Sequence, residues 1–344
     1  MIRPESWPTQ CHRLRCAPNR LMGHSGLSST LSETGGGKLA RARANGITLE
    51  VETWGDSAAP PILLIMGLGM QLTSWPEGFP EALVAQGFRV IAFDNRDCGL
   101  STRIRVGRKP NLLLQIARAW ARLPVRAPYT LDDMAADAVG LLEVLQIARA
   151  HIVGVSMGGM IAQLIAAHYP ERTASLTSIM SSSGNRRVSR GTPKAQRALL
   201  SRPDNPDDPE SVTRRLIELF GVIGSPAYPT DHKELRARIE RGVRRSYYPA
   251  GTAHQLLAIM ASGDRRWLLP KITAPTLVIH GAADPLVPVA AGRDTAHHIK
   301  GAQLKVIEGM GHDLPRALHP VLVEAIATHC RTTDGSSRSA ATAA

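Results

Sequence analysis

Gly154-Val155-Ser156-Met157-Gly158 is the stretch that decides the fold of this chain. It joins an apolar run, Ala150–Val155, to a helix-like stretch over residues 157–169, so Ser156 occupies a strand-to-helix corner. Glycines two residues before and two residues after the serine leave the space that a tight, strained turn requires. The pattern is that of a nucleophile elbow, which exposes a serine hydroxyl at the end of a strand.

A nucleophilic serine needs a base, and the base needs an acid that orients it. In an elbow fold these follow in the chain order Ser, Asp or Glu, His. A buried parallel strand is predicted over residues 275–281, and Asp284 lies just past its end; the next strand, residues 303–307, leads to His312. Because the carboxyl ends of parallel strands meet at one sheet edge, we expect Ser156, Asp284 and His312 to converge.

Other assignments of the base and the acid are open in the sequence. Asp284 could be a turn residue before Pro285, and Asp313, next to His312, is the main competitor for the acid. Other histidines could replace His312, but none is expected on a loop directly after a strand. These are His280, within a strand, His297 and His298, at a helix end, and His319 and His329, in the terminal helix region.

Two backbone N–H groups are expected to form an oxyanion hole. Met157 follows the nucleophile and supplies the first donor. The strand predicted over residues 61–66 opens into Gly67-Leu68-Gly69, where small residues let a carbonyl approach the backbone, so Leu68 supplies the second. The alternative is a glycine turn without a ligand role, because Met66 stands where a histidine often precedes this loop.

Taken together, these motifs resemble the α/β-hydrolase family over residues 47–330. Residues 93–101, Phe-Asp-Asn-Arg-Asp-Cys-Gly-Leu-Ser, are similar to the family segment after the fourth strand. Met66-Gly67-Leu68 paired with Ser74-Trp75-Pro76 most resembles the aclacinomycin methylesterase branch. The resemblance implies a mostly parallel eight-stranded sheet flanked by helices, with the catalytic residues named above. Asp94 and Arg96 are then expected to be structural, in a network under the elbow.

The chain divides into five predicted segments. Residues 1–45 are a disordered basic extension, and residues 46–184 form the first part of an α/β core in which strand and helix signals alternate. Residues 185–270 are a helical cap inserted after the sixth strand. Residues 271–331 complete the core, and residues 332–344 are a disordered tail. The extension resembles a transit peptide in composition, and a mis-assigned start codon explains it equally well.

Charge and cysteine usage narrow the class of protein. The net charge of +12 comes from two excesses, 7 basic against 2 acidic residues in 1–45 and 16 against 9 in 185–270. The rest is balanced, and no nucleic-acid motif accompanies the charge, so we expect no nucleic-acid partner. Four cysteines, without metal-ligand spacing or a disulfide framework, predict reduced thiols in a cytoplasmic protein. Apolar stretches are strand-sized, so no stable membrane insertion is expected.

The predicted activity is hydrolysis of a carboxylic ester through an acyl-enzyme, without a metal or organic cofactor. Alternatives on the same triad are thioester, lactone, amide or carbon–carbon bond hydrolysis and cofactor-free perhydrolysis; a receptor of this fold without catalysis is another class. Four apolar residues are candidates to line the pocket for a small-molecule ester: Trp75, Met160, Trp267 and Leu286. The physiological substrate and the oligomeric state are left open.

One basic segment lies outside these assignments. Residues 103–126 hold seven Lys or Arg and no acidic residue around an amphipathic run at 111–120. This run could border the pocket mouth and attract an anionic lipid surface, or it could simply be a helix packed on the cap.

Overall fold

The computed structural model describes residues 33–34, 37–107 and 111–342. Nine strands form one sheet in the order β1-β2-β3-β5-β4-β6-β7-β8-β9. Their bounds are β1 Glu33–Thr34, β2 Gly37–Ala44, β3 Ile47–Trp54, β4 Pro61–Ile65, β5 Arg89–Phe93, β6 Ala150–Val155, β7 Thr173–Ile179, β8 Thr276–Gly281 and β9 Gln303–Ile307. Every pairing from β5 to β9 is parallel, while those of β1, β2 and β3 are antiparallel. The predicted mostly parallel sheet is confirmed, with the two-residue β1 added to eight longer strands.

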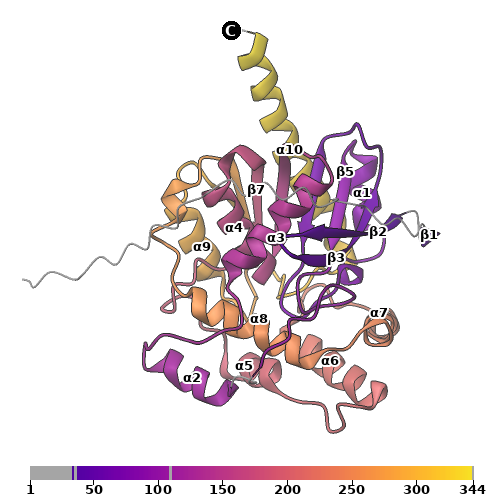
Figure 1. The fold of residues 1–344 in the computed structure, drawn as a ribbon, viewed down its shortest axis with the longest axis vertical. Helices are drawn as coiled ribbons and strands as arrows, with labels where there is room; N and C mark the ends of the chain where they lie inside the picture. Colours follow the sequence, from indigo (N-terminus) through magenta and orange to yellow (C-terminus); the bar gives the residue numbers. More distant parts are fainter. Residues whose placement is uncertain (1–32, 35–36, 108–110, 343–344) are drawn as a thin grey trace, which may run out of the picture.

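Helices cover both faces of this sheet and one of its ends (Figure 1). The described residues include α1 Phe79–Ala85, α2 Leu112–Trp120, α3 Leu131–Val144, α4 Met157–His168, α5 Pro193–Leu200, α6 Pro209–Ile223, α7 His232–Arg245, α8 Pro249–Ser262, α9 Val289–His298 and α10 His319–Thr342. One apolar core joins the sheet to α3 and α4, and the other joins it to α1 and α10. The central strands are buried on both sides, which explains their continuous apolar runs.

Local signals fix where the helices begin. Thr130 and Asp133 form a reciprocal capping box at the start of α3. The cap helices α6 and α7 each begin after an aspartate, Asp208 and Asp231, whose carboxylate accepts backbone N–H bonds of the first turn. The four helices α5–α8 occupy residues 193–262, inside the range predicted for the cap. Helix α2 lies at the same end of the molecule and contacts α8 (Figure 1).

Two predicted boundaries differ from the structure. The folded core begins before residue 46, because β2 pairs with β3 from Lys38 opposite Thr53 to Ala44 opposite Ile47. Ala42 and Ala44 are buried in the core that includes α3, but they alternate with arginines and so give little hydrophobic signal. At the other end, α10 continues to Thr342, through the predicted tail. The rest of the predicted extension, residues 1–32 and 35–36, lies outside the described residues.

Candidate active site

Ser156 lies at the corner between β6 and α4 in a backbone conformation that non-glycine residues rarely adopt. Its φ is +55° and its ψ is −117°. A Cβ added to Gly154 would stand 2.1 Å from the carbonyl oxygen of Gly158, and a Cβ on Gly158 would stand 2.0 Å from that of Ile65. The two glycines are therefore required by the tight corner, for the reason that the sequence suggested. The turn presents the serine hydroxyl at the carboxyl end of the sheet.

The structure brings Ser156, His312 and Asp284 into one hydrogen-bonded chain. His312 Nε2 lies 3.0 Å from Ser156 Oγ, and His312 Nδ1 lies 2.7 Å from Asp284 Oδ2. The histidine and the aspartate are buried. Because Nδ1 faces a carboxylate, it carries the proton, which leaves Nε2 able to accept the serine hydroxyl proton.

The Asp284 carboxylate is held by its own loop. Its Oδ1 accepts the N–H groups of Leu286 at 2.9 Å and Val287 at 2.8 Å, so Oδ2 is left facing the imidazole. A second histidine, His280 on β8, places Nε2 2.8 Å from the Val287 carbonyl and 3.6 Å from Asp284 Oδ2. Burial lowers the pKa of His280, so it stays neutral as a donor. This contact was not predicted from the sequence, where the i, i+4 spacing of His280 and Asp284 is the one signal for it.

Asp313, the competitor for the acid, does not face His312 Nδ1. Its carboxylate accepts the Ser225 hydroxyl at 2.5 Å, and burial raises its pKa. Ser225 Oγ in turn accepts the Gly311 N–H at 2.8 Å, and the His312 N–H donates to the Ile223 carbonyl at 2.7 Å. The loop that carries the histidine is thus bonded to the last residue of cap helix α6 and to the segment that follows it.

The loop after β4 lies against the serine. A Cβ added to Gly67 would approach the Cβ of Ser156 to 3.2 Å, which is a tight contact, so glycine lets the loop lie close to the nucleophile. Among the described residues, the N–H of Leu68 has no hydrogen-bond acceptor, and the Met157 N–H is the first of α4 and has none within the helix. Gly69 N–H donates to Gln255 Oε1 on α8 at 2.8 Å, which ties this loop to the cap.

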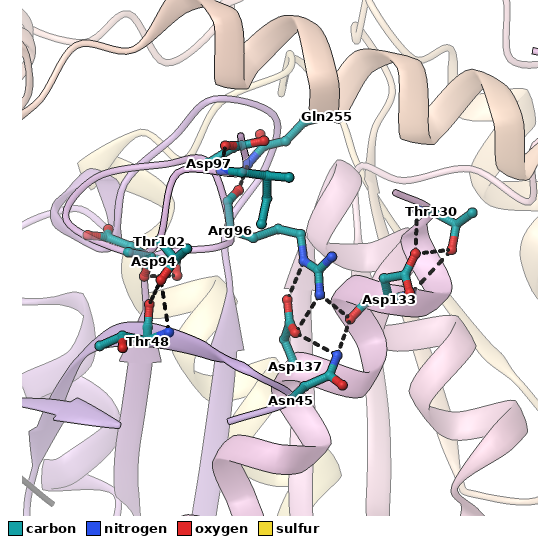
Figure 2. Close-up of polar contacts among 12 residues, drawn as sticks. Asn45, Thr48, Asp94, Arg96, Asp97, Thr102, Thr130, Asp133, Asp137 and Gln255 are labelled. Atoms are coloured by element: carbon teal, nitrogen blue, oxygen red, sulfur yellow. Dashed lines mark hydrogen bonds and ion pairs between the residues drawn. The ribbon is translucent and has the colours of Figure 1, made fainter. Parts of the chain in front are cut away.

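Asp94 and Arg96 belong to two separate networks. Arg96 reaches α3, where Nε lies 2.6 Å from Asp137 Oδ2 and Nη2 lies 2.7 Å from Oδ1 (Figure 2). Asp94 instead accepts the Leu72 N–H at 2.7 Å and pairs with Arg245 of the cap at 2.7 Å. Burial raises the pKa of Asp94 and the Arg245 guanidinium opposes that shift. Both residues join chain segments around the site, and neither touches the triad.

A cavity of about 610 Å³ opens at Ser156 between the sheet edge and the cap. Its lining is largely apolar, and it includes Met160 and Leu286 of the four predicted pocket residues, together with His312 and Leu68. Trp75 and Trp267 are not in this lining. Trp75 is buried in a stack with Phe79, with ring centroids 5.5 Å apart, and Trp267 is 67% exposed beside Lys271. In sequence an aromatic residue near a motif does not reveal which way it faces.

Within residues 33–34, 37–107 and 111–342, no group of three His, Cys, Asp or Glu side chains is placed to hold a metal ion. No helix in those ranges is both long and apolar enough to cross a membrane. Cys98 and Cys330 are both buried.

Comparison with known proteins identifies the family. Residues 60–315 match the family described as alpha/beta hydrolase fold. Rhodomycin D methylesterase of Streptomyces peucetius is 33% identical over 312 residues, which is 83% of this chain and 95% of that protein. 3-Oxoadipate enol-lactonase 2 of Acinetobacter baylyi is 27% identical over 77% of this chain and 86% of its own length.

A solved structure supports the fold. The enol-lactonase from Burkholderia xenovorans superposes with a TM-score of 0.65 at 24% identity, over 84% of this chain and 98% of that one. The fold and the resemblance to the methylesterase branch, both predicted from the sequence, are confirmed. This chain belongs to the alpha/beta hydrolase family.

Proposed function

We propose that this protein is a serine hydrolase of carboxylic esters, with Ser156 as nucleophile, His312 as general base and Asp284 as the acid that orients it. The observation that carries the proposal is the continuous chain from Ser156 Oγ to His312 at 3.0 Å and on to Asp284 at 2.7 Å. Such distances permit proton transfer from the hydroxyl to the imidazole as the serine attacks a carbonyl.

The reaction then follows from the placement of the groups. Ser156 Oγ adds to the ester carbonyl carbon and its proton moves to His312 Nε2, while Asp284 stabilises the imidazolium. The N–H groups of Leu68 and Met157 stabilise the negative oxygen of the tetrahedral intermediate. The alcohol leaves with the proton from His312. Water, deprotonated by the same imidazole, then attacks the acyl-enzyme and releases the acid and the free serine.

The substrate that we propose is an ester of a bulky apolar acid with a small alcohol such as methanol. Two observations support it: a relative that matches most of the chain is a methylesterase, and the cavity of about 610 Å³ is lined mainly by apolar side chains. Because another relative is an enol-lactonase, lactones are the second candidate. A hydrolysis panel of methyl esters, lactones, thioesters and amides with closely related acyl groups separates these classes.

The cytoplasmic location stays a prediction from the cysteine pattern.

The central test is Ser156→Ala. We expect turnover of a short p-nitrophenyl ester to fall by several orders of magnitude, because the nucleophile is lost while the fold is kept. The matched control is Ser74→Ala, which removes another hydroxyl that lines the same cavity. A thermal melt establishes that both variants fold, and a fluorophosphonate probe should label the wild type and Ser74→Ala but not Ser156→Ala. Near-normal turnover by folded Ser156→Ala would exclude this serine from the mechanism.

A further inference from the structure

Helix α2 is turned with its apolar side chains toward solvent. Leu113 is 76% exposed, Leu114 54% and Trp120 70%, whereas the polar Gln115 of the same helix is buried. The Gln115 side chain is satisfied there, since its Oε1 accepts the Arg126 N–H at 2.8 Å. Helix α2 does contact cap helix α8, as the packing alternative predicts, but these three apolar side chains are exposed. A helix that buries a glutamine and exposes leucines and a tryptophan has a face suited to a partner.

This face borders the mouth of the cavity that contains Ser156. Ile116 and Trp120 of α2 line that cavity. The segment leading to α5 meets them there: the Arg186 guanidinium donates to the Ala119 carbonyl, and the Arg190 guanidinium lies 5.0 Å from the centre of the Trp120 ring. The apolar lining of the cavity is thus continuous with the exposed apolar face of α2.

The two segments that meet at the mouth carry charges of one sign. Residues 111–126 contain three Lys or Arg and residues 185–203 contain six, and neither segment contains an Asp or Glu. Further exposed apolar side chains, Leu123 at 51% and Leu200 at 49%, stand within these same segments. We name residues 111–126 and 185–203 together the entrance surface. It combines exposed leucines and a tryptophan with basic side chains only.

We propose that the entrance surface docks on anionic lipid bilayers as a peripheral contact. Lysines and arginines are attracted to the negative potential of such a membrane, and leucine and tryptophan side chains enter the boundary between headgroups and acyl chains. No part of the chain needs to span the bilayer. Docking would turn the mouth toward the lipid, so that an amphiphilic ester enters the cavity without crossing water. This delivery step rests on the proposed esterase function, whereas docking itself does not.

The experiment is co-sedimentation of the full chain with vesicles, using Ser156→Ala so that no ester is consumed. The probes are vesicles of phosphatidylcholine with phosphatidylglycerol, 1:1, and vesicles of phosphatidylcholine alone. We expect most of the protein to pellet with the anionic vesicles at low salt and little with the neutral ones. The bound fraction should fall several-fold in 0.5 M NaCl, where the Debye length is only about 4 Å.

Two sets of variants test which residues bind. On the Ser156→Ala background, Leu113→Ser with Trp120→Ser, and separately Arg122→Glu with Arg126→Glu, should each reduce the bound fraction at least fivefold. The matched controls alter equally exposed positions elsewhere: Trp267→Ser for the apolar set, and Lys300→Glu with Lys305→Glu for the charged set. These controls should bind as the parent protein does, and thermal melts establish that every variant folds.

Three results would overturn the proposal. The first is a parent protein that stays in the supernatant with anionic vesicles at low salt. The second is entrance-surface variants that bind as well as their controls. The third is a lipid-free dimer that the variants convert to monomer, since the surface would then be an interface between copies. Failure of the esterase proposal gives a different pattern, in which vesicle binding is intact and hydrolysis by the wild type is absent.

Discussion

Backbone N–H groups hold the Asp284 carboxylate in the orientation in which it bonds His312. One carboxylate oxygen accepts two loop N–H groups and the other faces His312 at 2.7 Å. The rotation of the carboxylate is fixed before any substrate binds. An asparagine in its place could keep the bonds from the two loop N–H groups. Its neutral amide could not stabilise an imidazolium or enforce the tautomer with the proton on Nδ1.

We therefore expect Asp284→Asn to lower kcat by about 10³–10⁴-fold with little change in KM. Asp313→Asn is the matched control, because Asp313 is a buried carboxylate on the histidine loop that bonds Ser225 and not the imidazole. It should lose less than about tenfold. Steady-state kinetics on a p-nitrophenyl ester measures both variants, and an equal loss in the two would mean that Asp284 has no special role.

At the scale of residues, the order of motifs in the sequence predicted which catalytic side chains come together. It did not predict which way individual side chains point. The spacing of Ser156, Asp284 and His312 behind three strands was readable because parallel strands end at one edge. Trp75 and Trp267 were candidates to line the pocket, but neither lines it. One faces the core and the other faces solvent, and such directions depend on packing between segments far apart in the chain.

At the scale of elements, cap helix α8 supports the loop that is proposed to stabilise the oxyanion. Gln255 is fully buried, and its Oε1 accepts the Gly69 N–H at 2.8 Å while its Nε2 donates to the Arg96 carbonyl at 2.8 Å. Figure 2 shows this side chain reaching from the helix toward Arg96. The helix thus bonds two loops at the sheet edge, one after β4 and one after β5. Leu68 lies directly before the bonded Gly69.

Gln255→Met, which keeps the length but removes both hydrogen bonds, should lower kcat by about tenfold and change KM less, because each lost bond to a buried partner costs about 1–3 kcal/mol. Gln255→Glu keeps an acceptor for the Gly69 N–H, so we expect it to recover part of the lost kcat. A merely structural effect would lower the melting temperature of both variants and leave the kcat of the folded fraction unchanged. That outcome would contradict a role in holding the loop.

The elements themselves were predicted where periodicity was strong. Strands β6 and β9 begin and end where the sequence predicted them. The exceptions are β2, whose alanines bury little area between arginines, and α10, which extends through a stretch of small and polar residues. The position of β2 depends on its pairing with β3 more than on a hydrophobic pattern, and the small and polar residues at the end of α10 carry no hydrophobic period.

At the scale of the whole molecule, the shape of the acyl pocket depends on how the cap packs, and this shape could not be predicted from the sequence. Its helices α5, α6, α7 and α8 each contribute residues to the cavity lining, and their packing helps to define the acyl pocket. No local pattern encodes that shape. The charge distribution was readable, however: an excess of basic residues in the cap and a balanced core follow directly from counting.

Two buried glutamates differ in their partners, and this difference affects how the stability of the whole molecule depends on pH. Glu50 and Glu52 are both largely buried on β3. Glu50 faces Arg41 across the antiparallel pair and accepts its Nε at 3.0 Å, whereas Glu52 stands opposite Leu39. Burial raises the pKa of Glu52 to about 7, and the nearby carboxylate of Glu81 adds to the shift.

A carboxyl whose pKa is higher in the folded state destabilises the fold once it ionises. From its ordinary pKa of 4.5 up to about 7, the folded protein holds a proton that the unfolded chain releases, so the free energy of unfolding falls as the pH rises through this window. Glu52→Gln removes the ionisation. We expect its melting temperature to exceed that of the wild type by a few degrees at pH 8 and to match it near pH 4.

The control is Glu50→Gln, which neutralises a carboxylate on the same face of β3 but breaks its pair with Arg41. It should give no gain at pH 8, because the charge that it removes already has a cationic partner. Melting curves of the three proteins at pH 4, 6 and 8 decide the matter. If Glu52→Gln gains nothing between pH 4 and pH 8, the side chain must stay ionised in the folded protein, solvated or paired well enough to offset its burial.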